Sequence, residues 1–180
     1  FNSTNPTATY VTDDYYGLLD DNEGLFVNDL VDIGIGRFPV STKYEADILV
    51  EKVENYYSSD SFGSWRNDIL FVADDGDAND QNIHMWQSDS LSNIVDDNYK
   101  NININKIYLD SYYQESSPAG PRSQTAQDAI TNRINKGVLL VNYTGHGSPL
   151  GWAQERILEV DQINNFENQY LPLFMTATCK

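Results

Sequence analysis

Short runs of apolar, mostly β-branched residues recur along the chain, and each has the length of a buried strand. They occupy residues 31–35, 69–73, 104–109, 138–143 and 171–176. Between them, apolar residues recur three and four positions apart, the spacing of amphipathic helices, over residues 44–56, 83–95 and 126–134. Ser41, Thr42 and Ser123 are candidate N-caps, and Gly137 is placed to end the third helix. Alternating strands and helices predict an α/β fold with a mostly parallel sheet and helices on its faces.

The segment 58–64 is polar, contains a glycine and separates the first helix from the strand at 69–73, so it predicts a domain boundary. Residues 61–180 carry most of the predicted elements and are expected to form one three-layer domain. Residues 1–60 carry one strand and one helix, too little for a core of their own. Because the chain begins with Phe1 rather than Met and stops just after a predicted strand, we expect it to be a piece of a larger protein.

The chain is strongly acidic: its 180 residues include 27 Asp and Glu against 11 Lys and Arg, a formal net charge of −16. The basic residues do not cluster, so a nucleic acid would be repelled and we do not expect one as a partner. The apolar runs are far too short to cross a bilayer, so the sequence predicts no transmembrane segment.

Three side chains with catalytic potential follow predicted strands. Asp75 follows residues 69–73, His146 follows residues 138–143 between two glycines, and Cys179, the only cysteine, follows residues 171–176. The carboxyl ends of parallel strands meet at one edge of a sheet, which is where ligands bind in this fold class. We therefore expect a carboxylate, an imidazole and a thiol to lie together at that edge.

This set predicts nucleophilic catalysis by cysteine. Cys179 would be the nucleophile, and His146 would accept its proton and return it to the leaving amine. Asp75 would orient the imidazole, and the N–H groups of Gly147 and Cys179 would bind the oxyanion. Such chemistry requires no cofactor. The alternatives are an inert buried thiol at Cys179 and an ordinary turn around His146.

The acidic loop after the 69–73 strand also suggests a cation site. Asp75, Asp77 and Asn79 offer alternate oxygen ligands of the kind that Ca²⁺ prefers, so a structural calcium ion is one prediction. The loop lacks the glycine and the glutamate that an EF-hand requires, and a solvated turn is the alternative. His84, near this loop, is expected on a helix surface or in a cap.

Several segments resemble a known family. The run 142–148, with sequence NYTGHGS, and a strand that ends in Ala177-Thr178-Cys179 are similar to the gingipain (C25) cysteine peptidases of the caspase-like clan. The segment 36–39, GRFP, resembles the junction between the two catalytic subdomains of that family. The resemblance implies a caspase-like three-layer fold, truncated after the nucleophile strand. Residues 1–60 would be the C-terminal part of the first subdomain with its linking helix, and residues 61–180 an incomplete second, catalytic subdomain.

The resemblance also implies roles for individual residues. Cys179 matches the nucleophile and His146 the general acid/base, while Gly147 and Cys179 match the oxyanion donors. Asp75 stands where secreted gingipains carry a catalytic glutamate. Trp152 would be a wall of the substrate cleft, or alternatively a core tryptophan.

A narrower similarity, over residues 65–67, 71–77, 120–122 and 150–156, is to the C25 sortases of the bacterial type IX secretion system. It implies a transpeptidase that cleaves C-terminal sorting domains from exported cargo proteins and transfers the cargo to an amine of a surface glycolipid. It also implies export to the cell surface or outer membrane of a Bacteroidetes-like bacterium, and contact with other secretion components. A secreted hydrolytic C25 protease and a non-catalytic docking module with the same fold are the alternatives.

Overall fold

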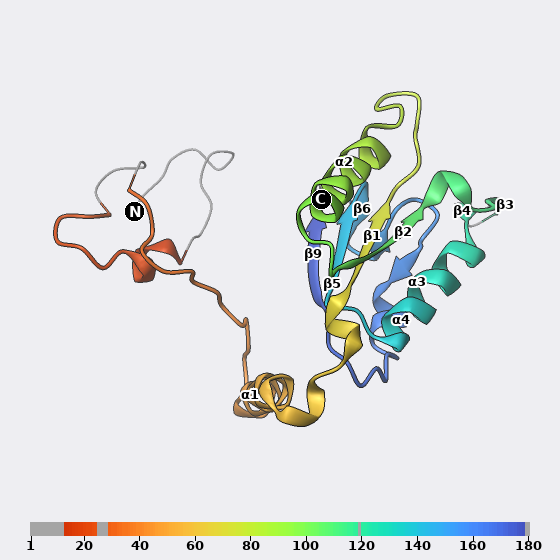
Figure 1. Cartoon of the computed structure of the whole chain (residues 1–180). Helices are drawn as coiled ribbons and strands as arrows, with labels where there is room; N and C mark the ends of the chain where they lie inside the picture. Colours follow the sequence, from red (N-terminus) through yellow and green to blue (C-terminus); the bar gives the residue numbers. More distant parts are fainter. Residues whose placement is uncertain (1–12, 25–28, 119, 179–180) are drawn as a thin grey trace. The chain divides into compact units, whose positions relative to one another are not determined.

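The computed structural model describes residues 13–24, 29–118 and 120–178 (Figure 1). The chain divides into two compact units, residues 1–54 and 55–180. The division lies within helix α1 (Lys43–Tyr57), a few residues before the boundary predicted at residue 60. Each unit is described by itself below.

In the first unit, the 3-10 helix η1 (Asp14–Gly17) and the start of α1 are the regular elements of the described residues. The α1 helix is confirmed, and so is its cap: Glu45 N–H donates to Thr42 Oγ1, while Glu45 Oε2 accepts from the N–H groups of Ser41 and Thr42. The strand predicted at residues 31–35 is wrong. These residues are exposed, and they pair with no strand in the described ranges. Alternating apolar residues form a stable strand only where a neighbouring strand pairs with them.

The second unit is built on a parallel sheet with the strand order β2-β1-β5-β9. The strands are β1 (Asp68–Ala73), β2 (Asn103–Tyr108), β5 (Leu140–Thr144) and β9 (Leu173–Ala177). Each neighbouring pair is parallel, and all four strands lie within two residues of the ranges predicted from sequence. The predicted mostly parallel α/β fold is therefore confirmed.

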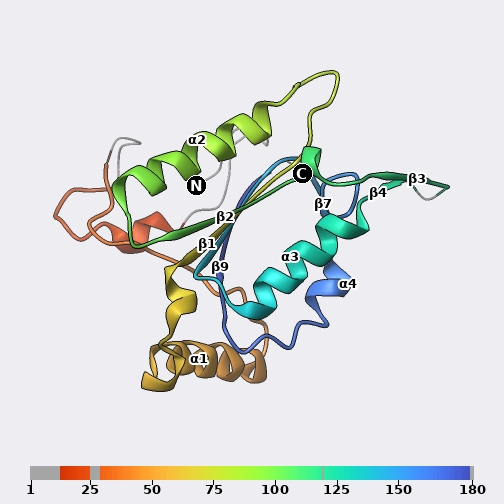
Figure 2. The same ribbon diagram turned by 45° about the vertical axis from the view of Figure 1, so that its right-hand side comes forward.

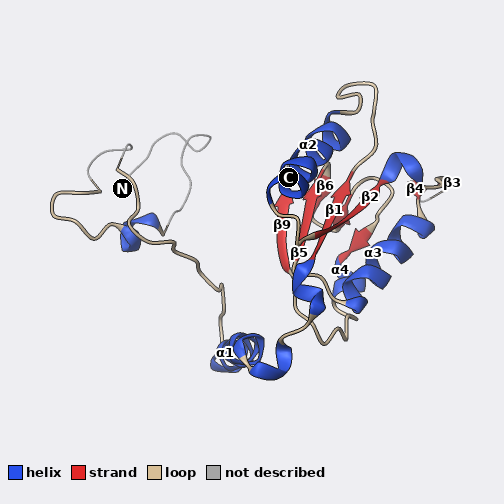
Figure 3. Ribbon diagram, in the orientation of Figure 1, coloured by secondary structure: helices blue, strands red, loops and turns tan. Residues whose placement is uncertain are grey.

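Helices cover both faces of this sheet. Figure 2 shows α2 (Ile83–Asn98) on one face and α3 (Gln124–Lys136) with the short α4 (Val160–Ile163) on the other, and Figure 3 shows the strands in red between them. The α3 face is the apolar core. It buries the side chains of Leu70, Val72, Ile107, Ala126, Ile130, Ile134, Val138, Val141 and Tyr143.

The α2 helix packs differently from the sequence expectation. Its apolar residues Ile83, Trp86, Leu91 and Ile94 are exposed, and the buried positions are Ser88 and Ser92. Short serine side chains fill little space between a helix and a sheet, whereas the Trp86 ring is far larger. The helix was predicted correctly, but the face that contacts the sheet was not.

Smaller elements lie between the main strands and helices. The 3-10 helices η2 (Ser59–Ser61), η3 (Ser64–Asn67) and η4 (Leu109–Ser111) and the hairpin of β3 (Glu115–Ser117) with β4 (Gly120–Arg122) lie in connections. The strands β6 (Gly147–Ser148), β7 (Gly151–Trp152) and β8 (Leu158–Glu159) form a separate antiparallel sheet directly after β5. Within the described ranges, no helix combines the length and hydrophobicity needed to span a membrane.

Candidate active site

The parallel register brings the ends of three strands to one edge of the sheet. Ala73 of β1 pairs with Thr144 of β5, which pairs in turn with Ala177 of β9. The backbone beyond the strands continues this pattern, since Gly145 N–H donates to Ala177 O at 3.2 Å. Cys179 lies outside the described residues, so its predicted position stays a prediction. The segment directly before Cys179 leaves the sheet beside the segment directly before His146.

His146 is held at this edge by Asp74. Asp74 Oδ2 lies 3.0 Å from His146 Nδ1 and accepts the backbone N–H of the same residue at 2.9 Å. The carboxylate is buried, with 3% of its side chain exposed, while 44% of the imidazole is exposed. Burial raises the pKa of the Asp74 carboxyl, against the opposing effect of its hydrogen bonds from His146. The pairing fixes the ring and directs Nε2 away from Asp74.

The carboxylate that contacts Nδ1 of His146 is therefore Asp74, one residue before the expected Asp75. Asp75 Oδ2 instead accepts a hydrogen bond from Gln114 Nε2 at 2.8 Å. Successive side chains of an extended segment point to opposite sides, so a shift of one residue moves a carboxylate away from its partner. The Asp74-Asp75 pair was visible in the sequence, but the direction of each side chain was not. A catalytic role for Asp75 stays a prediction.

The side chain of Tyr143 fixes the backbone at His146. Its buried hydroxyl donates to His146 O at 2.5 Å and accepts the N–H of Ala153 at 3.1 Å. Burial raises the pKa of this hydroxyl well above its usual range, so the phenol stays a neutral donor. A Cβ on Gly145 would lie 2.4 Å from Asp74 Cβ and 2.5 Å from the Tyr143 hydroxyl. Only glycine fits there, which explains one of the two glycines that flank the histidine.

Trp152 stacks on Tyr143, with ring centroids 4.3 Å apart and an angle of 6° between the planes. It also lines a groove that contains Gly147 and Thr178, the residue before Cys179. A second cleft is lined by His146, Gly147, Leu150 and other residues of the segment 146–156. The roles of Trp152 in substrate binding and of Gly147 in oxyanion binding stay predictions.

The acidic loop forms a turn around Asp77. Asp77 Oδ1 accepts the N–H groups of Asn79 at 2.5 Å and Asp80 at 3.0 Å, and these hydrogen bonds lower the pKa of Asp77. This is the turn that the sequence offered as the alternative to a calcium site. Calcium at Asp75, Asp77 and Asn79 stays a prediction.

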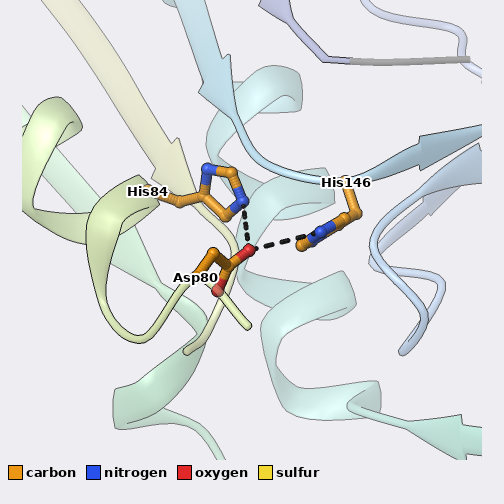
Figure 4. Close-up of side chains that lie close together, drawn as sticks. All are labelled: Asp80, His84 and His146. Atoms are coloured by element: carbon orange, nitrogen blue, oxygen red, sulfur yellow. Dashed lines mark ion pairs between the residues drawn. The ribbon is translucent and has the colours of Figure 1, made fainter. Parts of the chain in front are cut away.

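Three residues lie near His146 or its carboxylate although the sequence did not predict them there: Asp80, His84 and Glu155. Asp80 Oδ2 lies 2.9 Å from His84 Nε2 and 3.3 Å from His146 Nε2, so it stands between the two rings (Figure 4). The only sequence signal was the spacing of Asp80 and His84, four residues apart at the start of a helix. Their distance of more than 60 positions from His146 hid the cluster. Glu155 is a third missed residue, because it is buried within ligand distance of Asp74 and Asp75.

An α/β sheet that presents a histidine on a buried carboxylate, beside the strand that leads to a lone cysteine, has the framework of a cysteine-dependent hydrolase. Comparison with protein families bears this out at family level: the model of peptidase family C25 matches residues 3–180. The chain belongs to peptidase family C25.

Solved structures agree with this assignment. The chain is similar to the Arg specific cysteine proteinase gingipain R (RgpB), with a TM-score of 0.62 and 21% sequence identity over 93% of this chain and 35% of that one. It is also similar to the complex of Porphyromonas gingivalis RgpB pro- and mature domains, with a TM-score of 0.63, 20% identity and coverage of 93% and 36%. The chain thus spans about a third of the length of these structures. A search of curated proteins gave no significant match. The expected family and caspase-like fold class are confirmed.

Proposed function

We propose that this protein is a cysteine endopeptidase and transpeptidase, a sortase of the type IX secretion system similar to PorU. It would cleave C-terminal sorting domains from exported cargo proteins and transfer the cargo to an amine of a surface glycolipid. The observation that supports cysteine chemistry is the Asp74–His146 pair at the edge where β9 leads toward Cys179.

The proposed reaction assigns each group one task. His146 accepts the proton of the Cys179 thiol, and the thiolate attacks the scissile carbonyl carbon. The N–H groups of Gly147 and Cys179 bind the oxyanion, and His146 returns the proton to the leaving amine. An acceptor amine then attacks the thioester, which releases the thiol and forms a new amide bond. Asp74 stabilises the imidazolium that forms twice in this cycle.

Segments that resemble the sortases surround the site. The segment 71–77 supplies Asp74 at the end of β1, and the segment 150–156 forms the wall of the cleft beside His146. The resemblance favours export and a location at the cell surface or outer membrane, with contacts to other secretion components. The net charge of −16 disfavours direct adhesion to an anionic glycolipid surface, so we expect a partner protein to hold the enzyme there.

The test is incubation of the full-length protein with a cargo that carries a sorting domain and with a soluble amine acceptor. Mass spectrometry of the new cargo C-terminus distinguishes an amide from a free carboxylate. We expect the amide, and we expect none in the Cys179→Ala and His146→Ala variants. Free carboxylate alone would assign the protein to the hydrolytic C25 proteases. If folded Cys179→Ala protein still supports cargo processing, both enzymatic functions are excluded and the protein is a non-catalytic docking module.

A further inference from the structure

The side chains of Asp80, His84 and His146 converge on one point at the edge of the sheet. Figure 4 shows both rings with a nitrogen directed at the same Asp80 oxygen, at 2.9 Å for His84 Nε2 and 3.3 Å for His146 Nε2. The two rings meet edge to face, with centroids 4.8 Å apart and planes at 89°. One ligand atom from each residue lies within 4.8 Å of the others. The cluster thus offers two imidazole nitrogens and one carboxylate oxygen to a single site.

We propose that these three residues bind Zn²⁺ and that the bound metal inhibits the enzyme through His146. Zinc binds imidazole and carboxylate at about 2.0–2.2 Å in a tetrahedron, which places its ligand atoms about 3.4 Å apart. The two nitrogen–oxygen distances lie near that value, so small side-chain rotations would complete the site. Three protein ligands leave a fourth position for water.

The contacts of His84 support a metal ion at this position. Its Nε2 atom is shielded from solvent and makes no well-directed hydrogen bond, although Asp80 Oδ2 lies close to it. Asp80 is thus its one close partner, and a buried ring nitrogen whose only contact is poorly aligned leaves room for a better-placed ligand such as an ion. A cation between His84 and Asp80 would satisfy both the nitrogen and the carboxylate.

The contacts of His146 support the same site from the other side. Its Nδ1 atom faces Asp74, which leaves Nε2 for the metal. A carboxylate on the far nitrogen is the usual support of a zinc-bound histidine, because it fixes the ring and makes the bound nitrogen a better donor. Asp75 and Glu155 add carboxylates near Asp74, and they strengthen the local attraction for a divalent cation.

The donor set selects the kind of metal. Imidazole nitrogen suits zinc, copper or nickel, whereas calcium and magnesium require oxygen ligands in greater number. The inhibitory consequence rests on the proposed function: Nε2 of His146 is the nitrogen that Asp74 leaves free for the thiol proton. A zinc ion on that nitrogen would prevent the proton transfer. Zinc binding itself does not depend on the proposed function.

The binding experiment uses full-length Cys179→Ala protein, so that zinc captured by the thiol is not counted. Competition with a zinc chromophore should give one Zn²⁺ per chain that millimolar Ca²⁺ or Mg²⁺ does not displace. We expect affinity to fall at least about 30-fold in His84→Ala and in Asp80→Asn, and to stay unchanged in Asp97→Asn, an exposed acid of the same helix. Circular dichroism and melting curves confirm that each variant is folded. The absence of one-to-one binding, or equal affinity in folded His84→Ala, would overturn the proposal.

The activity experiment separates the site from its consequence. His84→Ala in the Cys179-containing enzyme should keep its basal turnover and require at least about 30-fold more Zn²⁺ for half inhibition. Equal zinc sensitivity in this variant and the parent would overturn inhibition through this site. An enzyme that proves inactive without zinc would contradict the proposed function, and the chromophore result would then decide the metal site alone.

Discussion

Replacement of Asp74 by asparagine tests which carboxylate serves His146. The matched control is Asp75→Asn, an identical change one residue away at the same edge of the sheet. If Asp74 orients the imidazole, its replacement should reduce turnover far more than the replacement of Asp75. If the catalytic carboxylate is instead Asp75, as the family resemblance implies, replacement of Asp75 should reduce turnover more than replacement of Asp74.

The size of the effect follows from the contacts. Asp74 Oδ2 accepts two hydrogen bonds from His146, and Oδ1 accepts the N–H of Asp75 at 3.1 Å. An asparagine has one oxygen, so its NH₂ group must face a backbone N–H in either orientation. One buried donor left without an acceptor costs about 1–3 kcal/mol, and loss of the charge that Asp74 holds in a buried position offsets part of it. We expect the melting temperature to fall by about 2–8 °C.

Turnover should change more than stability. Asparagine cannot stabilise an imidazolium as a carboxylate does, and it places the wrong hydrogen-bonding group at Nδ1 in one of its two orientations. In the serine protease triad this substitution lowers kcat by about 10⁴. We expect a loss of about 10²–10⁴ for Asp74→Asn. For Asp75→Asn we expect about 10-fold or less, because an asparagine oxygen can still accept from Gln114.

Two assays measure the prediction on the full-length protein. Cleavage of a fluorogenic cargo peptide gives kcat, and the rate of iodoacetamide alkylation at Cys179, followed by mass spectrometry from pH 5 to 9, reports the thiolate. Asp74→Asn should lower the alkylation rate on the acidic side, where the imidazolium supports the thiolate. An equal or greater loss of turnover in folded Asp75→Asn would refute the assignment of Asp74.

Three further outcomes are expected. Tyr143→Phe should reduce the free energy of unfolding by about 1 kcal/mol in urea titrations, because Ala153 N–H still donates to His146 O at 2.9 Å after the hydroxyl is gone; a loss near 4 kcal/mol would contradict this. Burial and nearby Asp75 raise the pKa of Glu155 in the fold, so the native state holds its proton more tightly than the unfolded chain and stability falls as pH rises through the folded pKa. Glu155→Gln should therefore gain stability over wild type at pH 8 and lose that gain below pH 4, and a gain independent of pH would exclude this cause. If the predicted calcium ion binds, CaCl₂ should raise the melting temperature relative to chelator, and Asp77→Asn should abolish the rise; identical curves would reject the site.

The sheet and its edge were predictable because they depend on local patterns. The apolar runs at β1 and β5 are mostly buried, so burial and sequence pattern agree there. The runs at β2 and β9 were also predicted as buried strands, but β2 has one buried position and β9 is exposed along its length. The position of a polar residue directly after such a run then places it at the edge without knowledge of the rest of the fold. His146 and the Asp74-Asp75 pair were located in this way.

The remaining features depend on contacts that no local pattern contains. The choice between Asp74 and Asp75 depends on how one peptide leaves β1. The burial of Ser88 and Ser92 in place of Trp86 depends on how closely α2 approaches the sheet. Residues 31–35 have a strand pattern, but a strand requires a partner, and partners are set by the whole chain.

The two carboxylates on His146 hold its ring with unequal strength. Asp74 is buried and contacts both the ring and the backbone N–H of His146, at 3.0 and 2.9 Å. Asp80 contacts only Nε2, at 3.3 Å, and its side chain is more exposed. A thiol proton therefore displaces the weaker contact, and a metal ion would enter between Asp80 and Nε2, while the stronger contact with Asp74 stays intact. This inequality allows one histidine to keep a fixed orientation while its other nitrogen exchanges partners, which both the proposed catalysis and the proposed inhibition by zinc require.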